Sequence, residues 1–277
     1  MTLLKQFLNF YINSSIHVSL AVCSLTWVTL IEYEIPFDEN LLFFMFFSSV
    51  TGYNFVKYYG IAKFHHRGLA SWLKAIQVFS FFCFIFMLFY ALKLNTKTLL
   101  YILGFGLVTF FYAIPFLPKH FFVDKKQNLR SIGGLKIYLI ALVWSGVTVL
   151  TPFINNDMNL SVDVFITGFQ RYLYIIVLMF PFEIRDLKFD NLKLSTIPQK
   201  IGVNKTKIIG SLILVSIFFL EFFKDEMSLK LLLVMVLINL CTLIALWFAK
   251  INQGKYYSSF WVEGIPVLWL ILLLLIN

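Results

Sequence analysis

The sequence predicts an all-α integral membrane protein. We expect one domain over residues 1–277, folded as a polytopic bundle of about nine transmembrane helices with a cytoplasmic N-terminus. Hydrophobic residues make up 60% of the chain and charged residues 13%, against roughly 25% charged residues in a typical soluble domain. Such a chain cannot cover its apolar surface with polar residues, so lipid must surround most of it.

Nine long apolar runs are the candidate membrane spans. They are residues 15–31, 41–59, 76–92, 98–117, 132–154, 161–184, 205–223, 229–250 and 259–276. A helix needs about 20 mostly apolar residues to cross the hydrocarbon core, and most runs have that length. The third run is the shortest, so the third and fourth could form a helical hairpin. Only Lys5 precedes the first run and no small-residue cleavage site follows it, so we expect it to remain as a helix.

The basic residues predict the orientation. The net charge is +9, and 18 of the 23 basic residues fall in the N-terminal tail or in the segments after the second, fourth, sixth and eighth runs. An excess of Lys and Arg marks cytoplasmic segments, so these segments are expected inside. A bacterial inner (cytoplasmic) membrane is the expected location. The same charges attract anionic membrane lipids, and no nucleic-acid partner is expected.

Three acidic residues gather at the cytoplasmic end of the sixth run: Glu183, Asp186 and Asp190. Their i, i+3, i+7 spacing places the three carboxylates on one face of a continuous helix. Like charges this close are unfavourable unless a cation joins them. Mg²⁺ suits the position, because it binds one or two carboxylates and completes its shell with phosphate oxygens and water.

Basic side chains surround these acids. They are Arg185, Lys188, Lys193 and Lys200. Cations of this kind neutralise and orient a diphosphate. The alternative is a solvated helix end in which Arg185 or Lys188 forms salt bridges with the acids. The spacing alone does not separate these interpretations.

The segment from Glu183 to Gly202 resembles the second aspartate-rich motif of the UbiA-type intramembrane prenyltransferases. In that family an R-D-x-x-x-D run precedes a T-[LI]-P-x-x-x-G run. The matching residues here are Arg185, Asp186, Asp190, Thr196, Pro198 and Gly202. The match follows the sixth of the nine runs, which is the position that the family's motif occupies.

The resemblance implies transfer of an isoprenoid chain from a prenyl diphosphate to a lipophilic acceptor, such as an aromatic compound or a quinone precursor. The implied catalytic residues and Mg²⁺ ligands are Glu183, Asp186 and Asp190. The implied diphosphate contacts near them are Arg185, Lys188 and Lys193. In such a site the metal stabilises the charge of the departing diphosphate while the acceptor attacks.

The family's first motif, N-D-x-x-D-x-x-x-D, is degenerate in this chain. Asn54 matches, but Phe55, Tyr58 and Ala62 stand at the three aspartate positions and cannot bind Mg²⁺. Asn54 is then a residual diphosphate contact, and Lys57 is expected to bind the diphosphate directly. Further basic residues nearby are Lys63, His65, His66 and Arg67. The alternative is that these cations only set the membrane orientation.

Two more charged residues lie within the apolar runs. Arg171 is twelve residues before Glu183, about 18 Å along a helix. A charge at such depth is a functional hypothesis by default, and snorkelling toward the outer surface is the alternative. Glu263 stands near the start of the ninth run, where it could face Arg185 or line the cavity. A simple interfacial ion pair is the alternative.

Two other functions compete with the enzyme. Loss of the first aspartate cluster suggests a family member without catalysis that binds an isoprenoid lipid or a membrane partner. A small transporter is the third possibility, and it would need polar residues deep in several helices. Only Arg171 lies deep, so the sequence favours the prenyltransferase.

Overall fold

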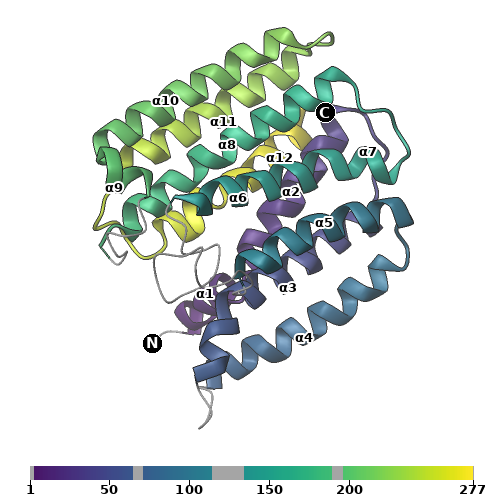
Figure 1. The fold of residues 1–277 in the computed structure, drawn as a ribbon. Coiled ribbons are helices and arrows are strands. Elements are labelled where there is room, and N and C mark those ends of the chain that lie inside the picture. Colours follow the sequence, from purple (N-terminus) through teal and green to yellow (C-terminus); the bar gives the residue numbers. More distant parts are fainter. Residues whose placement is uncertain (1–2, 65–70, 114–133, 189–195, 277) are drawn as a thin grey trace, which may run out of the picture.

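The computed structural model describes residues 3–64, 71–113, 134–188 and 196–276, and every regular element in these ranges is helical (Figure 1). In chain order the helices are α1 (Leu3–Asn13), α2 (Ile16–Glu32), α3 (Glu39–Phe64), α4 (Ser71–Ala91), α5 (Thr96–Ala113), α6 (Leu135–Ser145), α7 (Thr151–Asn155), α8 (Val162–Asp186), α9 (Ile197–Ile201), α10 (Val203–Leu220), α11 (Leu229–Phe248) and α12 (Ile265–Ile276). A π-helical turn, Gly146–Leu150, joins α6 to α7, and another, Tyr257–Val262, precedes α12.

Each of the nine predicted runs overlaps a helical segment. Within the described ranges, six segments are long and apolar enough to cross a membrane, and the bent pair of α1 and α2 raises the number to seven. Helix α5 is a shorter apolar helix, and α3 has 26 residues but includes the polar Asn54 and Lys57. The polytopic helical architecture is therefore confirmed, whereas nine spans and a cytoplasmic N-terminus stay predictions.

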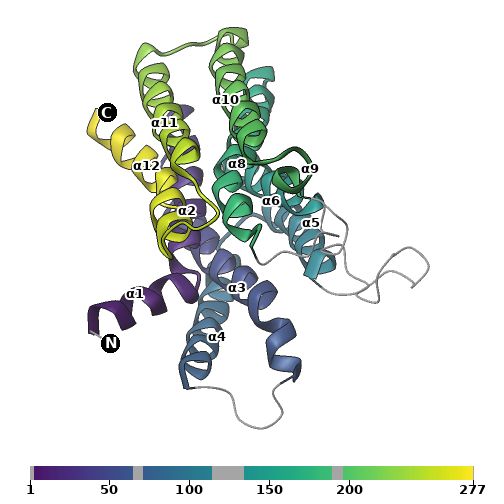
Figure 2. The same cartoon turned by 90° about the vertical axis from the view of Figure 1, so that its left-hand side faces the viewer.

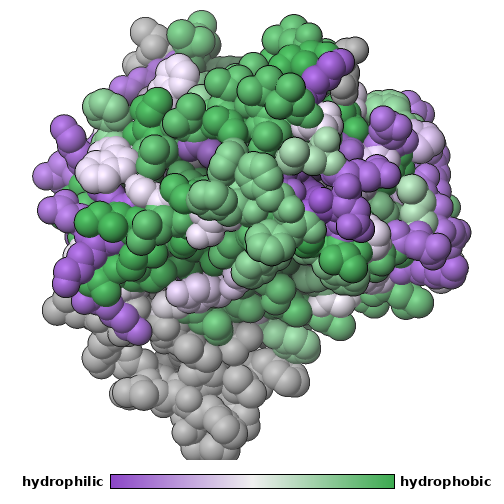
Figure 3. All heavy atoms as spheres, turned by 90° about the horizontal axis from the view of Figure 1, so that it is seen from above, coloured by the Kyte–Doolittle hydropathy of each residue, from purple (hydrophilic) through white to green (hydrophobic). Residues whose placement is uncertain are grey.

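The bundle has two chemically distinct ends. One end contains α1, the last turn of α8, α9 and residues 249–256, and we call it the motif end. The opposite end contains the connections at residues 33–38, 92–95, 156–161 and 221–228. Figure 2 shows the α10–α11 connection far from α1. In Figure 3 a mainly apolar band lies between two hydrophilic rims, as expected for a bundle whose middle faces lipid.

Helix α8 lies in the centre of the core. Its buried side chains, such as Tyr174 and Phe180, belong to one cluster with residues of α2, α6, α10, α11 and α12. Close approach of α10 requires Gly210, because a Cβ there would lie 2.5 Å from Cδ2 of Leu246 and 3.0 Å from the Phe180 ring. Small residues permit such packing in membranes, where van der Waals contact is a main source of helix association. This packing places α10 directly against the C-terminal half of α8.

Candidate active site at the motif end

The second motif begins in the last turn of α8, where Glu183 and Asp186 lie one turn apart on the same side of the helix. Glu183 is buried, with 1% of its surface exposed, whereas the Asp186 side chain is 20% exposed. Helix α8 ends at Asp186. That Asp190 shares this helical face stays a prediction. Asp190 and Lys193 lie outside the residues that the structure describes.

Two cations contact the carboxylate of Asp186. Arg185 donates from Nε to Oδ1 at 2.8 Å, and its Nη2 lies 2.8 Å from the same oxygen. Lys136 Nζ lies 3.7 Å from Oδ2. Lys188 is exposed just beyond the helix end. The salt bridge that the sequence left open as an alternative is thus present, in a position open to solvent.

Lys136 was not among the predicted site residues. It comes from the first turn of α6, which begins after Gly134 with a φ of 76°, a left-handed conformation that favours glycine. The available signal was the Gly133-Gly134-Leu135-Lys136 sequence before the fifth run, a pattern too common in membrane proteins to identify a site. Only the packing of α6 against α8 brings this lysine to Asp186.

The start of the ninth run meets the same cluster. Glu263, which precedes α12, is within electrostatic range of both Lys57 and Arg185. Lys57 belongs to α3, and its Nζ donates to the carbonyl of Asn13 at 3.0 Å. The electrostatic interaction of Glu263 with Arg185 agrees with the first of the arrangements that the sequence left open. The α3 half and the α8 half of the predicted site therefore converge at one end of the bundle.

Asn54 has an evident structural role. Its side chain is buried, and its Oδ1 accepts a hydrogen bond from Ser15 Oγ at 2.7 Å. Its Nδ2 donates to the carbonyl of Ser14 at 2.9 Å and to Ser80 Oγ at 2.7 Å. Both amide donors are used in these contacts. Asn54 ties the break between α1 and α2 to α3 and α4, and its contact with a diphosphate stays a prediction.

Two aromatic residues at the aspartate positions of the first motif pack locally. The Phe55 ring stacks on Phe110, with centroids 6.0 Å apart. Tyr58 donates its hydroxyl hydrogen to the carbonyl of Asn13 at 2.7 Å. These side chains stabilise the junction of α1, α3 and α5 and offer no carboxylate to a metal.

An almost wholly apolar cavity of about 230 Å³ adjoins the charged cluster. It lies between α2, α3, α5 and α6, and its lining includes Val22, Met45, Val56, Ile102, Phe105 and Val143. Tyr53 lines the cavity, accepts a hydrogen bond from Trp144 Nε1 at 2.6 Å, and is within electrostatic range of Glu263.

Comparison with solved structures identifies the fold. Neither protein-family models nor curated protein sequences match the chain. A UbiA homologue from Aeropyrum pernix K1 aligns with a TM-score of 0.63 at 14% identity, over 94% of this chain and 97% of that chain. The chain has the UbiA fold. Digeranylgeranylglyceryl phosphate synthase matches at a TM-score of 0.56 and 15% identity, over 98% of this chain and 97% of that one. A UbiA homologue from Archaeoglobus fulgidus bound to DMAPP and Mg²⁺ matches at 0.55 and 14%, over 95% of each chain.

Within the UbiA fold, the described part of this chain contains few metal-ligand candidates at the motif end. No group of three His, Cys, Asp or Glu residues suited to a metal ion occurs among the described residues. Magnesium in phosphate sites usually takes only one or two carboxylates and fills the other positions with water and phosphate oxygens. Asp186, with Glu183 one turn before it, meets that smaller requirement.

Proposed function

We propose that this chain is a UbiA-type prenyltransferase that moves an isoprenoid chain from a prenyl diphosphate to a lipophilic acceptor, with Mg²⁺ as cofactor. An aromatic compound or a quinone precursor is the proposed acceptor. The proposal rests on one observation above all: Lys57, Arg185 and Glu263 converge beside an apolar cavity, in a fold whose solved relatives bind DMAPP or GPP with Mg²⁺.

The proposed diphosphate contacts come from three helices. Arg185 of α8, Lys136 of α6 and Lys57 of α3 provide cations that bind phosphate oxygens, and Arg185 has the planar geometry for two parallel hydrogen bonds. Lys188, just beyond α8, and Lys193 would add charge at the entrance. A phosphate oxygen competes with Asp186 for Arg185 and Lys136, so binding frees the carboxylate for a metal ligand role.

Asp186, together with Glu183 and Asp190, would hold the Mg²⁺, which would neutralise the charge of the leaving diphosphate. Glu263 keeps Lys57 and Arg185 in one electrostatic cluster. The apolar cavity next to Tyr53 would hold the isoprenoid chain and exclude water from the reacting carbon. The excess of basic residues at the motif end supports an active site on the cytoplasmic side of a bacterial inner membrane.

Binding of labelled geranyl diphosphate to the protein in nanodiscs tests this proposal. We expect binding with Mg²⁺ that weakens by at least about tenfold in Asp186→Asn, because a carboxylate near the metal is lost. Asp157→Asn is the matched control, since Asp157 lies at the opposite end and is exposed. No binding by the parent protein, or equal binding by both variants, would refute the proposal. Incorporation of label into extracted membrane lipids then reports transfer.

A binding protein without catalysis is the second candidate. It is favoured by the engagement of Asn54, Phe55 and Tyr58 in local contacts, which leaves the first half-site without a carboxylate. This candidate predicts geranyl diphosphate or isoprenoid binding that persists in EDTA, with no labelled product from any acceptor. Binding that requires Mg²⁺ and yields product would exclude it.

A further inference from the structure

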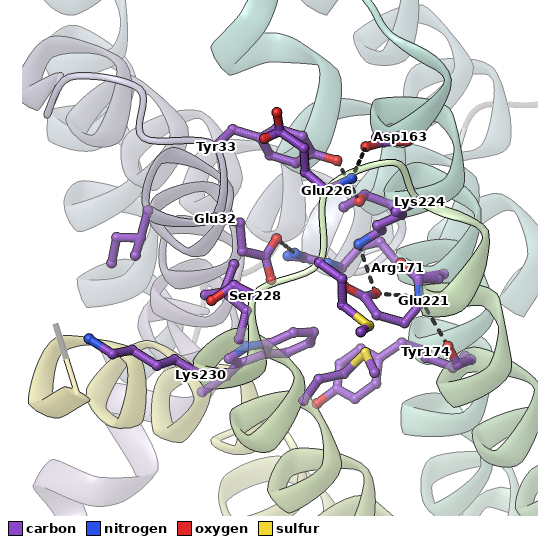
Figure 4. A pocket seen from close by; sticks show the side chains of 18 of the residues that line it. Glu32, Tyr33, Asp163, Arg171, Tyr174, Glu221, Lys224, Glu226, Ser228 and Lys230 are labelled. Carbon is purple, nitrogen blue, oxygen red and sulfur yellow. Dashed lines mark hydrogen bonds and ion pairs between the residues drawn. The ribbon is translucent and has the colours of Figure 1, made fainter.

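A second cavity lies at the opposite end of the bundle, away from the second motif. It has a volume of about 560 Å³ and is bounded by α2, α8, α11, α12 and the connection between α10 and α11 (Figure 4). Arg171 lines it, twelve residues from Glu183, which is about 18 Å along α8. A volume of roughly 300–1,000 Å³ is typical of small-molecule sites. The cavity is therefore large enough for a ligand that never meets the motif end.

Two buried ion pairs line the cavity. Arg171 Nη2 lies 3.3 Å from Glu32 Oε2, and its Nη1 donates to the carbonyl of Leu25 at 3.0 Å. The Arg171 side chain is 1% exposed, so it is paired inside the bundle rather than extended into water. Lys224 Nζ lies 2.8 Å from Glu221 Oε2, which also accepts from Gln170 at 2.9 Å. These pairs leave the inner half of the cavity close to neutral.

The mouth of the cavity is acidic. The lining includes five carboxylates, Glu32, Glu34, Asp163, Glu221 and Glu226, and three cations, Arg171, Lys224 and Lys230. After the two ion pairs are set aside, three carboxylates face one lysine. Asp163 accepts from the backbone amides of Asp225 and Glu226 at 3.1 and 3.4 Å, contacts that fix its carboxylate without adding a positive charge. The field at the mouth therefore favours cations.

The inner wall combines aromatic rings with a buried hydroxyl. Trp269 and Tyr174 are in edge-to-face contact, with centroids 5.2 Å apart, and both line the cavity. Tyr174 is 1% exposed, and its hydroxyl makes no hydrogen bond of standard geometry within the described ranges, although Thr242 lies near it. Ile31, Met227 and Leu231 add apolar surface. The Arg171 guanidinium already covers the Trp269 ring, with its Cζ 4.8 Å from the ring centroid. A ligand here would find apolar walls, the Tyr174 ring and an acidic entrance.

We propose that this cavity binds an ammonium group attached to an apolar body. Aromatic faces together with carboxylates are the groups that recognise organic ammonium ions. The amine can belong to a soluble molecule or to the head group of an ethanolamine lipid. The cavity opens at the exposed residues Glu34 and Glu226 at the opposite end of the bundle, where both kinds of molecule can reach it. This site does not depend on the proposed prenyl transfer.

Calorimetric titration of phenethylamine into the protein, held in nanodiscs of phosphatidylglycerol, tests the proposal. Phenethylamine should bind, and 3-phenylpropionate, which has a carboxylate in place of the amine, should not. Glu226→Gln should weaken phenethylamine binding about fivefold, because it removes one negative charge from the mouth of the cavity. Asp225→Asn is the matched control, since Asp225 is the adjacent acid but does not line the cavity. Tyr174→Phe should also weaken binding while removing only one oxygen atom.

The same titration in nanodiscs containing phosphatidylethanolamine distinguishes the two sources of the amine. Weaker phenethylamine binding in these discs would show that the lipid head group occupies the site, and unchanged binding would indicate a soluble amine. Preference for 3-phenylpropionate, absence of phenethylamine binding, or equal effects of Glu226→Gln and Asp225→Asn would overturn the proposal.

Discussion

Helix α8 has one arginine–carboxylate contact in its last turn and another near its middle, and the surroundings of the two contacts differ. At the motif end, Arg185 and Asp186 are partly exposed and lie near cations from α3 and α6. At the opposite end, Arg171 and Glu32 are largely enclosed, and the carboxylates around them outnumber the cations. The comparison shows that one helix passes through two regions of opposite charge, with cations from other helices at the motif end and carboxylates from other segments around the second cavity. We therefore expect an anion at the motif end and a cation at the other.

The largest expected effect concerns the stability of the opposite end. Arg171→Met leaves Glu32 without its cation in a largely enclosed site, so we expect a loss of about 3–5 kcal/mol in the free energy of unfolding. Thermal unfolding in detergent measures it. The double variant Arg171→Met/Glu32→Gln should recover part of the loss. An unchanged melting temperature in the single variant would show that the pair does not stabilise the bundle.

The corresponding change at the motif end should affect ligand binding rather than stability. Arg185→Met should weaken geranyl diphosphate binding by about 10- to 100-fold, the range for lost hydrogen bonds to a charged group. Its melting temperature should stay near that of the parent, because the side chain is 27% exposed. Arg185→Lys should restore part of the affinity. If Arg185→Met unfolds as readily as Arg171→Met, the proposed difference between the ends is wrong.

The apolar cavity offers a finer test. Gly52 lines it, and a Cβ at this position would meet no atom within 4 Å. Gly52→Leu should therefore fold normally, fill part of the cavity, and weaken geranyl diphosphate binding about tenfold while affecting the shorter DMAPP less. Gly146 provides the contrast, since a Cβ there would lie 2.2 Å from the Phe105 ring and should disturb folding. An equal loss of affinity for geranyl diphosphate and DMAPP would show that the isoprenoid chain binds outside this cavity.

The smallest effect is expected at the exposed pair of Lys97 and Asp157, whose Nζ and Oδ1 are 2.7 Å apart. The hydrogen bond and charge of Lys97 hold the Asp157 pKa below its ordinary value of 3.8. Any stability from the pair is thus present above that value and is lost as the pH falls through the lower folded pKa. Asp157→Asn should scarcely change the melting temperature at pH 7, and the difference from the parent should vanish in acid. If the difference in melting temperature persists in acid that protonates Asp157, it comes from packing and not from the charge of the carboxylate.

Features that depend on local sequence were the most predictable. The nine apolar runs overlap helical segments because run length and hydropathy are properties of contiguous residues. The run predicted at 161–184 matches α8, which spans Val162–Asp186, whereas the extension of its acidic face to Asp190 stays a prediction.

Features that depend on packing between distant segments could not be predicted. Lys136 reaches Asp186 only because α6 packs on α8. Arg171 finds Glu32, which lies 139 residues away in the sequence. Asn54 was predicted as a diphosphate contact from its place in a motif, but its hydrogen bonds come from residues up to 40 positions away. Pairings of this kind are absent from any single stretch of sequence.

Photolabelling with a prenyl diphosphate that has a diazirine in its isoprenoid chain would test the central claim most directly. After irradiation with Mg²⁺ and digestion, mass spectrometry locates the attached group. We predict labels on the cavity residues around Tyr53 and Trp144, suppressed by excess geranyl diphosphate and reduced in Arg185→Met. Specific labels around Trp269 at the opposite end would contradict the assignment of the two ends.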